Sequence, residues 1–141
     1  MATSAWLSVT CMLAACGAAA PAAPAAMSPA TRAPLGPEAA QALIGTWQVD
    51  LRPTPDADPY IQEFVVTAVD GTTFTGSFYG TPLTQGRINT AWGAVRIAFV
   101  TADNSGPYNH AAVLVGAQLE GLTNSTGRDF LAYWSATKTA R

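Results

Sequence analysis

The chain has 141 residues, a net charge of −2 and only 11% charged residues, whereas about a quarter is usual in soluble domains. This length suits one domain. Its few Lys and Arg residues are scattered singly, and both nucleic acid and anionic membrane surfaces are recognised by clustered positive charge. The composition therefore argues against a nucleic-acid partner and against a polybasic membrane patch.

Both cysteines, Cys11 and Cys16, lie close to the N-terminus. The chain beyond them therefore has no disulfide, no thiolate nucleophile and no cysteine metal ligand. A disulfide between the two cysteines is an alternative use of them. It would close a very short loop inside an apolar run, where it would stabilise no fold.

Residues 5–15 form an apolar run, Ala-Trp-Leu-Ser-Val-Thr-Cys-Met-Leu-Ala-Ala. The run is too short for a permanent transmembrane helix and has the length of a signal-peptide core. It leads into residues 13–16, Leu-Ala-Ala-Cys, which resemble the lipobox of bacterial lipoprotein signal peptides. The resemblance implies cleavage before Cys16 and its modification by acyl chains such as palmitate. Because Gly17 follows rather than Asp, it also implies an outer-membrane lipoprotein that faces the periplasm.

Two alternatives to this lipoprotein hypothesis stay open. In the first, residues 1–15 are an ordinary cleaved signal peptide and Cys16 is incidental, which would leave a soluble secreted or periplasmic protein. In the second, the chain is not exported at all. The hypotheses differ in one observable, because only a lipidated Cys16 attaches the protein to a membrane.

Residues 16–36 are rich in Ala and Pro, with Gly, Ser and Thr between them. Repeated prolines interrupt any helix, and such a composition cannot bury a core. We therefore expect a disordered tether between the lipid anchor and a folded domain at residues 37–141. That domain has about 100 residues, enough for a single core. At about 3.1 Å per residue, the tether could span roughly 60 Å.

Residues 37–44 predict a short helix, because Pro37 suits a first turn, Glu38 favours the positive end and Gly45 can end it. From Thr46 onward, turn signals recur at short intervals, as is typical of an all-β sandwich or barrel. Eight strands are expected, at residues 46–52, 60–69, 73–80, 83–91, 94–102, 108–115, 118–124 and 129–137.

All but the first of the joints between these strands are short, so neighbouring strands should pair antiparallel as a meander. Asp70-Gly71 is a strong hairpin signal, because type I′ turns need positive φ at both central residues. Several strands alternate, as where Trp47, Val49 and Leu51 share one face. A long meander with one apolar face per strand buries that face by closing, which also removes both edges. We expect an all-β fold, a small eight-stranded antiparallel up-and-down barrel, with an interior that holds side chains or one small ligand.

The tripeptide Gly-Thr-Trp, from Gly45 to Trp47, is similar to the Gly-x-Trp signature of the lipocalin and avidin-type barrels, the calycins. Residues 74–79, Phe-Thr-Gly-Ser-Phe-Tyr, also resemble the third strand of an avidin-type barrel. The resemblance implies structural roles for Gly45 and Trp47, with the indole at the closed end beside a basic residue, Lys138 or Arg141. The biotin contacts of avidins do not map onto this chain, so no specific ligand is implied.

His110 is the only histidine, and no Ser-His-Asp spacing accompanies it. We therefore expect no catalytic residues, and we interpret His110 as a strand histidine with a local hydrogen bond. Residues 56–58 and 103–106 are oxygen-rich but lack the ligand spacing of a calcium loop, so we interpret them as turns and expect no metal or other cofactor. Residues 124–128 indicate a hairpin loop with a solvated Arg, or alternatively a small anion nest.

Arg87 and Asn89 share one face of the strand at 83–91, and Arg96 lies on the polar face of the next strand, so these residues can meet across the pair. If this face points inward, they would fix a ligand in an otherwise apolar cavity. If it points outward, they are ordinary solvent-facing residues. Tyr133 raises the same alternatives, and Trp134 is either core or part of a ligand site.

Our leading hypothesis is an envelope lipoprotein that binds a small apolar or amphipathic ligand in its barrel and is not an enzyme. The second hypothesis is a protein-interaction module, such as a periplasmic inhibitor of a lytic enzyme. Lysozyme inhibitors of this kind are also lipid-anchored barrels, although they usually carry a disulfide. The third is an enzyme that depends on His110. The sequence carries no signal for an oligomeric state.

Overall fold

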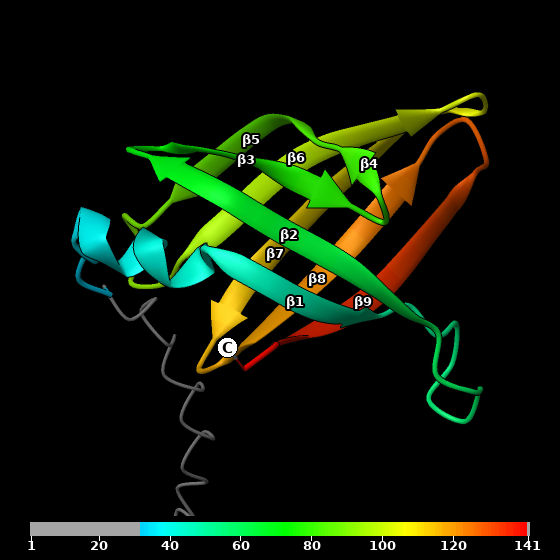
Figure 1. Ribbon diagram of the computed structural model, residues 1–141, viewed down its shortest axis with the longest axis horizontal. Helices are drawn as coiled ribbons and strands as arrows, with labels where there is room; N and C mark the ends of the chain where they lie inside the picture. The colour runs from blue at the N-terminus through cyan, green and yellow to red at the C-terminus, as the bar shows by residue number, and fades with distance from the viewer. Residues whose placement is uncertain (1–31, 141) are drawn as a thin grey trace, which may run out of the picture. The chain divides into compact units, whose positions relative to one another are not determined.

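The computed structural model describes residues 32–140 and shows antiparallel strands that follow one another from Gly45 to Lys138 (Figure 1). All the connections between strands are short except the loop at 51–60, which joins the first two strands. The signal peptide and lipidated Cys16 that the sequence predicts lie outside the described residues, as does Arg141. Within the described part of the chain, no helix is long and apolar enough to cross a membrane.

In the part of the chain that the structure describes, one short helix precedes nine strands, eight of which close into a barrel. The helix is a 3-10 helix, η1 (Pro37–Leu43). The strands are β1 (Gly45–Asp50), β2 (Ile61–Asp70), β3 (Thr73–Phe78), β4 (Thr81–Pro82), β5 (Thr84–Asn89), β6 (Arg96–Asp103), β7 (Gly106–Val115), β8 (Gln118–Ser125) and β9 (Phe130–Lys138).

Pairing of the last strand with the first closes the sheet. β9 pairs antiparallel with β1, where Trp47 lies opposite Lys138, and β2 pairs with β3. The two residues of β4 pair only with β3 and add a short edge outside the ring. The predicted all-β, eight-stranded antiparallel barrel is therefore confirmed, and β4 is an addition that the sequence did not indicate.

Buried and exposed side chains alternate along the strands, so that the apolar face of each strand points into the barrel interior. Phe64, Phe74, Phe78 and Phe99 all lie there, with less than a twentieth of their surface exposed. Phe64 stacks on Phe99 with ring centroids 5.1 Å apart, and Phe74 meets Phe99 edge-on at 5.8 Å. Trp134 is fully buried beside them, with its ring centroid 5.4 Å from that of Phe78. These aromatic rings fill the middle of the barrel, so a ligand cannot pass through it.

One end of the barrel is closed by η1, whose Leu43 is fully buried. The Nε1–H group of Trp47 donates a hydrogen bond to the Leu43 carbonyl at 2.8 Å. Lys138 Nζ donates to the Ala42 carbonyl at 2.7 Å and lies 5.3 Å from the centre of the Trp47 ring. Gly45 adopts φ 134°, and a Cβ there would come within 2.9 Å of Lys138 Cε. This is the arrangement implied for Gly45, Trp47 and a basic residue by the calycin resemblance, with Lys138 as that residue.

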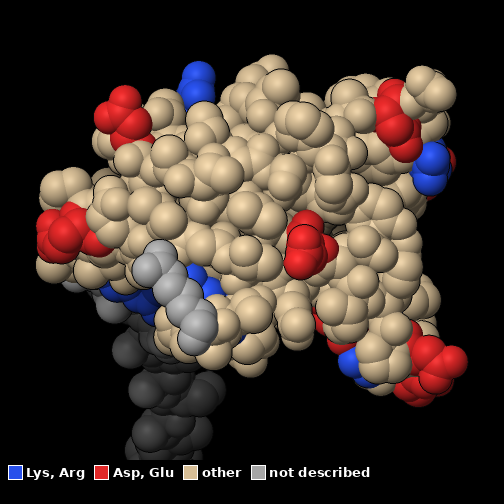
Figure 2. All heavy atoms as spheres, viewed as in Figure 1, with Lys and Arg blue, Asp and Glu red and all other residues tan. Residues whose placement is uncertain are grey.

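The connections divide between the two ends of the barrel. η1 lies at one end with the β2–β3 turn, at the left of Figure 1, and we call this the closed end. The β6–β7 and β8–β9 connections lie at the other, the open end. On the face shown in Figure 2 the charged side chains are few and scattered, with no continuous patch of one sign.

Candidate ligand site

A pocket of about 420 Å³ enters the barrel at the open end. Volumes of this order are typical of small-molecule sites, which combine apolar walls with a few polar groups. Its walls include side chains from β3, β6, β7, β8 and β9, together with the connections at that end. The apolar lining includes Leu51, Phe78, Phe130 and Ala132.

Three polar side chains inside the pocket are almost completely buried, and we call them the polar floor. They are Thr101, His110 and Thr123, with exposed fractions of 7%, 4% and 5%. Each occupies an inward position of its strand, because β6, β7 and β8 alternate buried and more exposed residues there. The strand register places His110 between the two threonine-bearing strands.

His110 bonds both threonines at once. Thr101 Oγ1 lies 2.9 Å from its Nε2 atom, and Thr123 Oγ1 lies 2.8 Å from its Nδ1 atom. The imidazole stacks on Phe99 at 4.5 Å with 15° between the planes, and Phe78 also approaches to 4.5 Å. Burial among these side chains lowers the pKa of His110 to about 4 from its ordinary 6.5. The ring is therefore neutral near pH 7.

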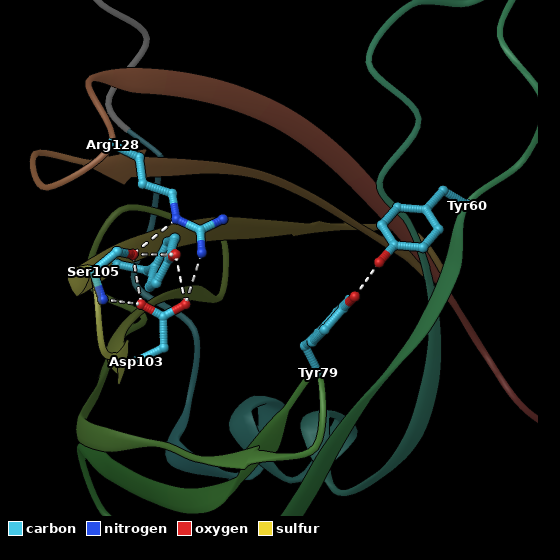
Figure 3. A network of polar contacts seen from close by, with 6 residues as sticks. Tyr60, Tyr79, Asp103, Ser105 and Arg128 are labelled. Carbon is cyan, nitrogen blue, oxygen red and sulfur yellow. Dashed lines mark hydrogen bonds and ion pairs between the residues drawn. The ribbon is translucent and has the colours of Figure 1, made fainter.

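One side of the pocket mouth is a network centred on the Asp103 carboxylate, shown in Figure 3. Ser105 donates to Oδ1 from its backbone N–H at 2.8 Å and from its hydroxyl at 2.6 Å. The Tyr108 hydroxyl donates to Oδ2 at 2.8 Å. These hydrogen bonds lower the pKa of Asp103 to about 2, and those from Ser105 have the largest effect. The carboxylate is therefore charged at any ordinary pH.

Arg128 completes this network. Its Nη2 atom lies 3.2 Å from Asp103 Oδ2, and its Nε–H donates to Ser105 Oγ at 2.8 Å. The guanidinium carbon lies 5.7 Å from the centre of the Tyr108 ring. Among the described residues, Asp103 and Arg128 are the only charged ones that line the pocket, and their charges are paired. The Arg of the loop at 124–128 is therefore paired with Asp103 and Ser105 and is not simply solvated.

Two tyrosines form a separate group at the mouth, on the right of Figure 3. The hydroxyl groups of Tyr60 and Tyr79 are hydrogen-bonded to each other, and their rings meet edge-to-face with centroids 6.0 Å apart. The hydrogen bond with Tyr79 raises the pKa of Tyr60. Both rings are about half exposed, so the mouth offers aromatic surface to an entering molecule.

Arg87, Asn89 and Arg96 do not reach this pocket. On β5 the buried positions are Gly86 and Ile88, so Arg87 and Asn89 project outward. Asn89 does lie opposite Arg96 across the β5–β6 pair, as expected, but its side chain accepts a hydrogen bond from the Ala91 N–H at 3.0 Å. Arg96 donates to the Trp92 carbonyl at 3.3 Å. The inward orientation on which their ligand-binding role depended is absent.

Tyr133 and Trp134 point in opposite directions from β9. Tyr133 is more than half exposed on the outer surface, opposite Leu122 of β8. Trp134 points inward but belongs to the aromatic core and does not line the pocket. Ala132, two residues earlier on the inward face, lines the pocket in its place.

The predicted turn at 103–106 is a turn, since Asp103 accepts a hydrogen bond from the Ser105 N–H, but it also forms part of the pocket mouth. The polar floor was missed at Thr101 and Thr123. The sequence did carry a signal for both residues: Thr101 follows Phe99 by two positions and Thr123 follows Gly121 by two, so each is a polar residue on the inward face of its strand. His110 makes the local hydrogen bonds expected of it, and it does so inside the pocket.

Among residues 32–140, no group of three or more His, Cys, Asp and Glu residues is placed to hold a metal ion. No family model, curated protein or solved structure matches the chain. The function is therefore inferred from the geometry of the pocket. The barrel is compatible with a calycin-like fold on its topology alone. Its chemistry is that of a neutral, aromatic-walled pocket with hydrogen-bonding groups at its base.

Proposed function

We propose that the protein binds a small amphipathic ligand in the open-end pocket of its barrel. The polar floor carries this proposal. Thr101, His110 and Thr123 are almost completely buried, yet all three line a cavity. Apolar walls with a few convergent polar groups are the usual composition of a small-molecule site.

The filled interior supports a short ligand. Phe64, Phe99 and Trp134 occupy the barrel beyond the floor, and close-packed side chains leave no room for a long acyl chain. The pocket of about 420 Å³ suits a compact molecule. We therefore place the ligand between the polar floor and the aromatic mouth.

The state of His110 supports binding without catalysis. A general base works best when its pKa lies near the operating pH, whereas burial lowers the pKa of His110 to about 4. Both ring nitrogens are hydrogen-bonded to threonine hydroxyls. An ordinary threonine hydroxyl cannot orient the ring and stabilise its charged form as a carboxylate does. The floor is suited to holding a ligand, and we propose no reaction for it.

On the lipobox resemblance, we propose that Cys16 anchors the protein to the outer membrane on its periplasmic side. The described part of the chain enters the barrel at the closed end, where the Leu35 N–H donates to the Thr90 carbonyl at 3.0 Å. This end lies opposite the pocket mouth. The alternative is a soluble periplasmic or secreted protein.

A titration with the fluorescent probe N-phenyl-1-naphthylamine tests the proposed pocket. We expect saturable binding of one probe per chain, and loss of binding in Ala132→Trp, which places an indole in the pocket. Ala111→Trp is the matched control, because Ala111 is exposed on the outer face of β7. Absence of binding to the wild-type protein, or equal loss in both variants, would overturn the proposal and favour the protein-interaction module.

A further inference from the structure

We infer that the pocket selects an uncharged ring compound whose inner end both donates and accepts a hydrogen bond, because His110 couples the two floor hydroxyls. This inference rests on the proposed function and names the chemical class of its ligand. Three features carry it. They are the hydrogen-bond donors and acceptors that the floor leaves free, the charge balance of the pocket and the aromatic rings of its walls.

The free donors and acceptors of the floor follow from the neutral state of the His110 imidazole. Such a ring has one N–H donor and one acceptor nitrogen. One of Thr101 and Thr123 must therefore donate its proton to the ring, while the other accepts from the ring and keeps its own proton. Within residues 32–140, neither hydroxyl makes another hydrogen bond. The floor thus offers a ligand one free O–H donor and one hydroxyl that can only accept.

The two tautomers of His110 exchange these roles. With the proton on Nδ1, Thr123 accepts from the ring and keeps a free O–H; with the proton on Nε2, Thr101 does so. Both states keep both ring hydrogen bonds. A ligand that donates and accepts can be matched in either state, whereas a ligand with neither function leaves a buried hydroxyl unpaired, which is unfavourable.

The charge balance disfavours an ion. The pocket is lined by one acidic and one basic side chain, Asp103 and Arg128, and these are paired at 3.2 Å. Asp103 is also bonded by Ser105 and Tyr108. A bound carboxylate would have to compete with Asp103 for the guanidinium, and a charge without a free partner is costly to remove from water.

The walls favour a flat ring. Phe78 lies beside the floor, where its ring centroid is 4.5 Å from that of His110. Nearer the mouth, Tyr108 and Phe130 approach each other with centroids 6.2 Å apart, and Tyr60 and Tyr79 form the second aromatic group. Aromatic side chains in such arrangements stack on, or meet edge-on, a planar ligand.

A naphthalene series tests the inference by isothermal titration at pH 7. 2-Naphthol donates and accepts, 2-methoxynaphthalene only accepts, naphthalene does neither, and 2-naphthoate is an anion. We expect 2-naphthol to bind about fivefold more tightly than 2-methoxynaphthalene, as one lost neutral hydrogen bond predicts. We expect 2-naphthoate to bind about tenfold more weakly than 2-naphthol. Equal affinities for the first two, or tightest binding of 2-naphthoate, would overturn the inference.

Floor variants tie the preference to the residues named. Thr101→Val and Thr123→Val keep the side-chain shape and remove one hydroxyl each, so each should weaken the preference for 2-naphthol, and the double variant should abolish it while naphthalene still binds. Thr137→Val is the matched control, because Thr137 is exposed on β9. Thr101→Ser and Thr123→Ser restore a hydroxyl and should restore the preference, which also serves if the valine variants fail to fold. An undiminished preference in the folded double variant would contradict the floor as its source.

The single histidine gives a direct readout, because its ring nitrogens produce one pair of nitrogen NMR signals. We expect 2-naphthol to shift these signals more than naphthalene does, because only 2-naphthol bonds the hydroxyls that are themselves bonded to the ring. If N-phenyl-1-naphthylamine binds but the series shows no preference, only the present inference fails. If neither that probe nor any member of the series binds, the proposed function fails with it.

Discussion

Gly121 of β8 lies directly opposite Trp134 of β9, and a Cβ atom at position 121 would approach indole Cζ2 to 2.3 Å. The indole is fully buried in the aromatic core, so it has no space into which to move. Overpacking of a close-packed interior costs about 1–3 kcal/mol. We expect Gly121→Ala to lower the free energy of unfolding by about that amount, as measured by urea denaturation.

The cost should depend on the indole. In the background of Trp134→Leu, the same Gly121→Ala change should cost less, because the branched side chain leaves space above position 121. Contacting residues commonly show such coupling, with interaction energies of about 0.5–3 kcal/mol. Additive effects of the two substitutions would contradict a direct contact between these residues.

Lys138 fixes η1 to the closed end through its bond to the Ala42 carbonyl and its position over the Trp47 ring. We expect Lys138→Met, which keeps the length of the aliphatic stem, to lower the free energy of unfolding by about 1–2 kcal/mol. Arg87→Met is the matched control, since Arg87 is exposed on the outer surface of β5. Thermal denaturation compares the two variants. Equal melting temperatures would show that the closed end does not depend on Lys138.

Most of the fold could be predicted from local patterns. The alternation of Phe74 and Phe78 on β3 indicates its buried face, and Asp70-Gly71 correctly marks the β2–β3 hairpin. The type I′ turn expected there is wrong in one respect: the turn residues are Gly71 and Thr72, so only Gly71, at φ 55°, has a positive φ and Asp70 ends β2. Closure then follows because every strand has one face to bury. β4 escaped notice because two residues carry no period.

The pocket was harder to predict, for a physical reason. Thr101, His110 and Thr123 lie on three different strands, and they meet only because the registers of β6, β7 and β8 place them together. Register depends on the whole barrel, not on a local motif. Threonine is also common in strands, so its presence gave no chemical signal. The outward face of Arg87 was readable, since Ile88 next to it is the apolar residue that had to be buried.

Cys16 offers a test that is independent of the barrel. If Cys16 carries acyl chains, Cys16→Ser should move the protein from the membrane fraction to the soluble fraction, because lipid chains supply the membrane affinity. Cys11→Ser is the matched control and should leave the distribution unchanged. Fractionation followed by immunodetection measures both. A Cys16→Ser protein that stays with the membrane would contradict the anchor, and a wild-type protein that is already soluble would favour the secreted alternative.

The buried imidazole predicts how stability depends on pH. The folded protein takes up a proton on His110 at a pKa of about 4, whereas the unfolded chain does so near 6.5. The unfolded state therefore binds more protons in this window, and the free energy of unfolding must fall as pH decreases from 6.5 towards 4. The full difference amounts to about 3 kcal/mol. His110→Gln, which can still donate to one threonine and accept from the other, should lack this loss. Urea denaturation of both proteins at pH 7, 5.5 and 4.5 measures it, and parallel pH profiles would show that His110 is not the group responsible.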